Sequence, residues 1–134
     1  MAGFVLSSRC GGVFMMSIHV ENISDLAVIE CKGRITRSDT VFKLRDTVLA
    51  QEDSSIITLD LSEVEAMSGG GLGMLAFLER WTREHDIRLK LYRPSKPVLE
   101  GLVQNRSILN FEIVSFHEMM SVLAQFDGRY AIAA

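Results

Sequence analysis

Apolar residues along the chain follow two different spacings, one typical of strands and one typical of helices. Apolar and polar residues alternate from Ile18 to Ile23, and a second apolar segment follows the turn-forming pair Ser24-Asp25. The two segments predict a β-hairpin that Gly33 ends. The run from Ile56 to Leu61 is almost continuously apolar, which is typical of a central strand covered on both faces. Strands are predicted at residues 18–23, 26–31, 56–61, 87–92 and 111–114.

Helical periodicity lies between these strands. Val41, Leu44 and Val48 follow one another at i, i+3 and i+7, which predicts a helix over residues 36–51. The strongest helix is predicted over residues 72–85, and its first half is apolar nearly all round, so it should be enclosed or touch a partner. Its apolar stripe consists of Met74, Phe77, Leu78 and Trp81. Two shorter helices are predicted, one capped by Ser95 and one opened by the capping box Ser115–Glu118.

The order of these elements predicts the fold class. Strands that alternate with helices indicate a layered α/β domain, with a mixed central sheet of about five strands and about four helices. The length of 134 residues fits one domain with one core. We expect that domain over residues 17–127, after a flexible extension over residues 1–16 and before a tail over residues 128–134. Met15 and Met16 are candidates for the natural start.

Charge and composition argue against several classes of partner. The formal net charge is −3, and no run of Lys or Arg offers a basic patch for nucleic acid or a membrane surface. No apolar run approaches the roughly 20 residues that cross a bilayer, so we expect no membrane insertion. Cys10 and Cys31 lack the spacing of metal ligands or of a redox pair, which is typical of a reduced cytoplasmic protein.

The segment from Asp60 to Gly73 joins the end of a buried strand to a short connector, three successive glycines and an apolar helix. With the order of the elements, it resembles the signature of the STAS domain, the family of bacterial anti-sigma factor antagonists and of the cytoplasmic tails of sulfate transporters. The resemblance covers about residues 17–126 and implies the STAS fold. It rests on Gly33, Asp60, Leu61, Ser62, Val64, Met67, Gly71, Leu72 and Gly73.

The resemblance also shows one departure from the family pattern. In antagonists of this family the loop usually reads Asp-Ser-Ser/Thr-Gly-Leu-Gly, and a partner kinase phosphorylates the first serine. Here Ser68 stands at the Asp position and Gly69 at the phosphoserine position, so the usual phosphoacceptor is missing. Ser68 is itself a candidate for phosphorylation, and its alternative role is to cap the following helix.

The glycine segment is the candidate binding site. Successive glycines allow a partner backbone to approach closely, and they lie where a helix begins, although a plain connector is the alternative reading. The predicted partner-binding residues are Ser68, Gly69, Gly70, Gly71, Leu72 and Gly73, with Thr36, Met67 and Met74 as additional candidates. The resemblance implies that Thr36 lies near this loop.

No catalytic constellation is recognisable in the sequence. The segment from Gly71 to Ala76 fits G-x-G-x-x-A, but it does not directly follow its strand and no acidic residue follows at the required spacing. The three histidines are scattered, and we expect Asp60 to bond the connector. We therefore expect no enzyme activity, no metal and no cofactor.

The resemblance implies a protein-binding function. The expected partner is a serine-kinase anti-sigma factor or another cytoplasmic regulatory protein. Capture of the anti-sigma factor would release a sigma factor, without regulation at the usual loop serine. The alternative is a STAS subunit of a lipid-transport ABC complex or of a stress-signalling assembly. The sequence predicts no oligomeric state.

Overall fold

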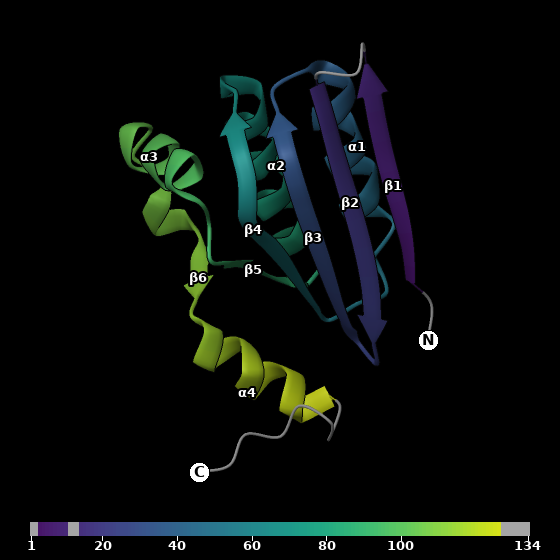
Figure 1. The fold of residues 1–134 in the computed structure, drawn as a ribbon. Coiled ribbons are helices and arrows are strands. Elements are labelled where there is room, and N and C mark those ends of the chain that lie inside the picture. Colours follow the sequence, from purple (N-terminus) through teal and green to yellow (C-terminus); the bar gives the residue numbers. More distant parts are fainter. Residues whose placement is uncertain (1–2, 11–13, 127–134) are drawn as a thin grey trace.

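Six strands of the described residues form one sheet whose spatial order follows the sequence (Figure 1). The computed structural model describes the backbone of residues 3–10 and 14–126 and the side chains of residues 16–124. The pairs β1–β2 and β2–β3 are antiparallel, whereas β3 to β6 run parallel, so the sheet is mixed as predicted. The strands are β1 (Gly3–Cys10), β2 (Phe14–Ile23), β3 (Leu26–Ile35), β4 (Ile56–Met67), β5 (Arg88–Tyr92) and β6 (Glu112–Val114).

Four α-helices and one short 3-10 helix complete the part of the chain that the structure describes. They are α1 (Ser38–Leu49), α2 (Gly69–Glu84), α3 (Lys96–Gln104), η1 (Ile108–Asn110) and α4 (Phe116–Phe126). The helices α1 and α2 pack side by side on one face of the sheet (Figure 1). The helix α4 lies at the opposite end of the sheet from the carboxyl ends of β3 and β4. The predicted α/β fold class is therefore confirmed.

The buried side chains form two clusters. The larger contains the predicted apolar face of α1, where Val41, Leu44 and Val48 are buried, together with the central strand β4. Burial of each such side chain stabilises the fold by on the order of 2 kcal/mol. The smaller cluster joins α4 to the sheet and contains Ile23, Leu26, Tyr92, Val114, Met119 and Leu123.

The first strand was not predicted. The sequence analysis assigned residues 1–16 to a flexible extension, but Gly3–Cys10 pairs along its whole length with β2, and β2 itself begins at Phe14. The sheet therefore has one strand more than expected. The predicted tail over residues 128–134 lies outside the described residues.

Two predicted strand ends were also wrong. Gly33 does not end its strand: with a φ of 102° it lies beside a register shift, and β3 continues to Ile35. The connector predicted after Leu61 is part of β4, which extends to Met67 because its second half pairs with the end of β3. The second half of β4 lacks the continuous apolar pattern of the first half. It remains a strand because its backbone pairs with β3.

Glu112 connects the two last strands through their side chains. It accepts a hydrogen bond of 2.6 Å from the Lys90 ammonium group, which is nearly buried, and two from the Arg88 guanidinium at 3.0 and 3.1 Å. Partial burial alone would raise the pKa of Glu112, but these hydrogen bonds and the positive charges of Lys90 and Arg88 outweigh it and lower the pKa. The carboxylate therefore stabilises the edge of the sheet in its ionised form.

We expect Glu112→Gln to lower the free energy of unfolding at pH 7 by about 1 kcal/mol, since the carboxylate is partly exposed. A lowered pKa means that this contribution is present above the unfolded-state pKa, near 4.3, and is lost as the pH falls through the folded-state value. Urea unfolding at pH 7 and near pH 3 would measure the difference between wild type and variant, which should shrink in acid. Glu100→Gln, in an exposed pair with Lys96 at 4.0 Å, is the control. A difference that does not depend on pH would contradict this assignment.

Candidate functional site

The carboxyl ends of β3 and β4 meet at one edge of the sheet. Ile35 and Met67 are register partners there, and the Ser68 N–H donates a hydrogen bond of 3.0 Å to the Ile35 carbonyl. The next residue after Ile35 is Thr36, which is half-buried. Parallel pairing thus brings Thr36 next to the glycine segment in space. We call the surface formed by Thr36 and residues 68–73 the Ser68 edge.

The three glycines form the first turn of α2 and not a loop before it. Ser68 is the N-cap: its Oγ accepts a hydrogen bond of 3.1 Å from the Gly71 N–H, and its carbonyl accepts one of 2.9 Å from the Leu72 N–H. The predicted helix start at Leu72 was therefore wrong by one turn. Glycine costs about 1 kcal/mol per residue in a helix, and the cap together with the buried residues of α2 offsets that cost.

The glycines of the Ser68 edge divide into two kinds. Gly71 is buried, and a Cβ atom there would lie 2.7 Å from Met67 Cγ and 3.1 Å from the Ile35 carbonyl oxygen. Gly69, Gly70 and Gly73 are exposed, and a Cβ atom at Gly69 or Gly73 would meet nothing within 4 Å. Gly71 thus lets α2 approach β3, while the other three leave bare backbone facing solvent.

The longer side chains of the predicted site pack toward the core of the domain. Met67, Leu72 and Met74 are half-buried and pack against the larger core cluster. Leu72 also lies against Gly101 of α3, where a Cβ atom would come within 2.7 Å of Leu72 Cδ1. Their contact with a partner stays a prediction, and their packing role is what the structure describes.

An exposed aromatic side chain extends the edge along α2. Phe77 belongs to the apolar stripe that was predicted to be enclosed or to touch a partner, and it is 46% exposed. It shares one helix face with Gly70 and Gly73, since the three residues are spaced at i, i+3 and i+7. Phe42 on α1 is equally exposed at 46%. The sequence analysis named neither residue individually as a candidate contact, because periodicity identifies apolar residues but not which of them remain uncovered.

Asp60 on β4 and Cys31 on β3 are two potentially reactive side chains on the strands that lead to the Ser68 edge. Asp60 Oδ1 accepts hydrogen bonds from the Ser62 N–H at 3.0 Å and from Ser62 Oγ at 2.7 Å, as expected for a residue that bonds the neighbouring backbone. Burial, reinforced by the negative charges of Asp60 and Glu30, raises the pKa of the Cys31 thiol to about 12, so this cysteine stays protonated. No three potential metal ligands come together in residues 16–124.

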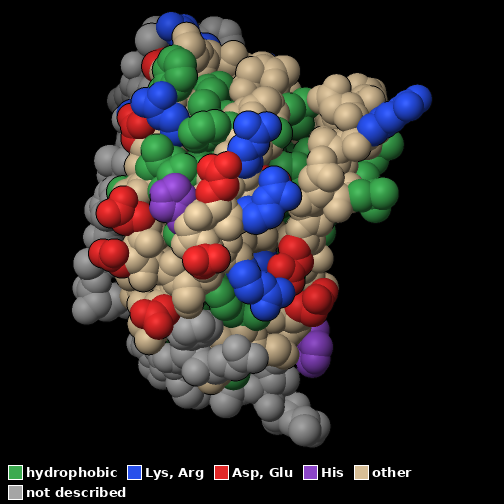
Figure 2. Space-filling model, turned by 180° about the vertical axis from the view of Figure 1, so that it is seen from behind, with side chains coloured by type: hydrophobic (Ala, Val, Ile, Leu, Met, Phe, Trp, Pro, Cys, Tyr) green, Lys and Arg blue, Asp and Glu red, His purple; other side chains and the backbone are tan. Residues whose placement is uncertain are grey.

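The surface charges are mixed. On the face shown in Figure 2, basic and acidic side chains alternate without a region of one sign. No helix in the described part of the chain has both the length and the apolar character needed to cross a membrane.

The sequence model of the STAS domain matches residues 17–122. The structure is similar to that of the Bacillus cell fate determinant SpoIIAA in its phosphorylated form, with a TM-score of 0.63 and 15% identity over 79% of this chain and 98% of that one. It is also similar to an anti-sigma factor antagonist from Mycobacterium paratuberculosis, with a TM-score of 0.68 and 16% identity over 81% and 93% of the two chains.

A putative anti-sigma factor antagonist from Thermotoga maritima gives a TM-score of 0.67 at 16% identity, over 78% of this chain and 92% of that one. At such identities the likeness shows the fold. A comparison with curated protein sequences gave no significant match.

The two kinds of glycine predict opposite responses to the same substitution. Gly71→Val should lower the free energy of unfolding by about 1–3 kcal/mol, because the new side chain collides with Met67 and the Ile35 carbonyl. Gly73→Val, in the same helix with open space around it, should leave stability within about 0.5 kcal/mol of wild type or raise it slightly. Chemical denaturation of both variants measures the contrast. Equal losses would show that helix α2 does not approach β3 as described.

Proposed function

Because the chain belongs to the STAS domain family, we propose that it is an anti-sigma factor antagonist that binds a serine-kinase anti-sigma factor through the Ser68 edge. The exposed glycines carry this proposal. Gly69, Gly70 and Gly73 present backbone without side chains at the start of α2, where a partner backbone can approach more closely than any other residue type allows. Phe77 adds an uncovered aromatic ring on the same helix face, which suits the centre of a protein interface.

We further propose that binding is not switched off by phosphorylation at position 69, where antagonists of this family usually have a serine. Gly69 has no hydroxyl group to accept a phosphate, and the Ser68 hydroxyl already serves as the cap of α2. A phosphate adds nearly two negative charges to an interface and excludes docking where the partner surface is closed around it. A chain that lacks this phosphorylation site would stay bound to its partner whenever both proteins are present.

The proposed activity is binding, with no chemical step in this chain. Ser68 caps α2 and Asp60 bonds Ser62, so both of these polar side chains already have structural partners. The free energy of complex formation would come from the surface that the partner covers. No cofactor takes part in this mechanism.

The first test uses Gly70→Asp. Gly70 is exposed, and an acidic residue in the first turn of a helix is favourable for its stability, so the variant should fold. A side chain and a charge at the centre of the edge should weaken binding at least about tenfold, which is about 1.4 kcal/mol. The partner is first recovered by affinity purification from the native host, and calorimetry then compares wild type, Gly70→Asp and the distant control Lys96→Glu. Unchanged affinity of Gly70→Asp would refute this docking site.

The second test restores a phosphoacceptor. A side chain at position 69 has open space around it, so Gly69→Ser should fold and should gain one phosphate from the serine kinase and ATP. The phosphorylated variant should release the partner, whereas wild type and the distant control Lys96→Ser, at an exposed position of α3, should stay bound. Mass spectrometry and gel filtration give the two readouts. Phosphate on Ser68 of the wild type would overturn the proposed loss of regulation, and recovery of transporter ATPase or permease subunits would favour the alternative of a STAS subunit.

A further inference from the structure

The strand β1 has one side of its backbone without a paired strand. It is the first strand in the order of the sheet, and all eight of its residues pair with β2 and with no other described strand (Figure 1). The register contains no shift, in contrast to the pairing of β3 with β4. The outer edge of β1 is therefore a regular row of N–H and C=O groups about 27 Å long. This edge lies outside the residues that match the STAS model, which begin at residue 17.

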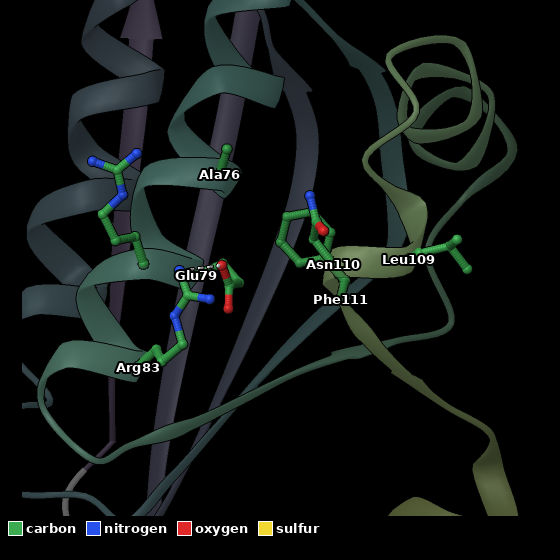
Figure 3. Close-up of a pocket in the computed structure, with 7 residues that line it drawn as sticks. Ala76, Glu79, Arg83, Leu109, Asn110 and Phe111 are labelled. Atoms are coloured by element: carbon green, nitrogen blue, oxygen red, sulfur yellow. Dashed lines mark ion pairs between the residues drawn. The ribbon is translucent and has the colours of Figure 1, made fainter.

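This edge lacks the features that normally keep a sheet from pairing with another chain. Natural edge strands carry charged residues or proline, contain bulges, or are very short. Residues 3–8 include no charged residue and no proline. The opposite edge is protected by its length, since β6 has three residues, η1 precedes it and α4 follows it. Figure 3 shows the segment before β6, with Asn110 and Phe111 opposite α2.

The register of β1 favours a second copy of this chain as the occupant of the edge. Two copies can pair antiparallel about a two-fold axis perpendicular to the sheet, and the residue at the axis then lies opposite its own equivalent. An axis at Leu6 pairs residues 3–9 of both copies and puts Gly3 opposite Arg9. Leu6 is the register partner of Ile18, which is fully buried, so the centre of the contact continues a row of the core.

The charges at the two ends of this contact are complementary. Gly3 is the register partner of Glu21, and the contact places Arg9 of the second copy on the other side of Gly3, in the same row. The backbones of Arg9 and Glu21 are then about 10 Å apart, which an Arg and a Glu side chain can span together across a glycine. Arg9 of the same chain lies at the far end of β1, about 20 Å from Gly3. Glu21 forms no ion pair with any other residue whose side chain the structure describes.

We infer that the chain forms a dimer in which β1 of one copy pairs antiparallel with β1 of the other, with Leu6 at the two-fold axis and Arg9 of each copy beside Glu21 of the other. The two sheets become one continuous sheet, and the helices α1 and α2 of both copies lie on the same face. Because the copies run in opposite directions, the two Ser68 edges lie at opposite ends of the dimer and outside the contact. The inference does not rest on the proposed function.

A charge exchange tests the contact. Analytical ultracentrifugation of the full chain measures the dissociation constant of the dimer. Arg9→Glu and Glu21→Arg should each raise it about tenfold, because each replaces two opposite-charge pairs with two like-charge pairs. The double variant Arg9→Glu/Glu21→Arg should return to within about threefold of wild type. The controls Lys96→Glu, on exposed α3, and Gly70→Asp, at the Ser68 edge, should leave it unchanged. A wild type that stays monomeric, or a double variant no better than the single ones, would overturn the inference.

Cross-linking tests the register independently. In a Cys10→Ser background, Leu6→Cys puts two thiols opposite each other at the axis, where the Cα atoms of antiparallel partners are about 4.5–5.5 Å apart and suit a disulfide. Mild oxidation should therefore cross-link Leu6→Cys into a covalent dimer. Ser8→Cys, on the same strand, should stay monomeric on a denaturing gel, since its own equivalent lies about 14 Å away. Equal cross-linking of both variants, or of neither, would contradict this contact.

Discussion

The candidate site depends on the parallel pairing of β3 and β4. This pairing reaches Ile35 and Met67, and the hydrogen bond from the Ser68 N–H to the Ile35 carbonyl ends it. A helix that starts immediately after the strand pair can then pack against it only if its first turn has no side chain on that side. Gly71 provides this, since a Cβ atom there would meet both Met67 and the Ile35 carbonyl. The strand pair, the cap and the buried glycine together fix where the exposed glycines lie.

The helix α2 combines a buried face with an exposed one. Leu75 and Leu78 are fully buried, while Phe77 between them is exposed. Leu72 points to α3, where Gly101 leaves room for it. Support of the first turn from β3 and from α3 gives the exposed backbone a defined position, which reduces the ordering cost when a partner binds.

Much of the architecture could be predicted from spacing alone. The hairpin, the apolar faces of α1 and α2 and the capping box were visible in the sequence, and the structure shows the reciprocal bonds between Ser115 and Glu118. The family resemblance placed Ser68 and Thr36 together, which the pairing of β3 with β4 explains. The different roles of Gly69, Gly70 and Gly71 were not predictable, because a glycine carries no information about the space around its missing side chain. The second half of β4 was missed because the pattern there no longer marks burial on both faces.

The uneven pairing of β4 has a consequence for its motions. Residues 56–60 pair with strands on both sides, whereas residues 63–67 pair with β3 alone, and α3 is tied to Leu61 by the Ser95 N–H. The second half of β4 is thus an edge strand, with β3 on one side and no paired strand on the other. Amide hydrogens in such an edge exchange with solvent by local opening, at a lower free energy than those of the sheet interior. The domain can therefore open the second half of β4 in a subglobal step while the rest of the sheet stays closed.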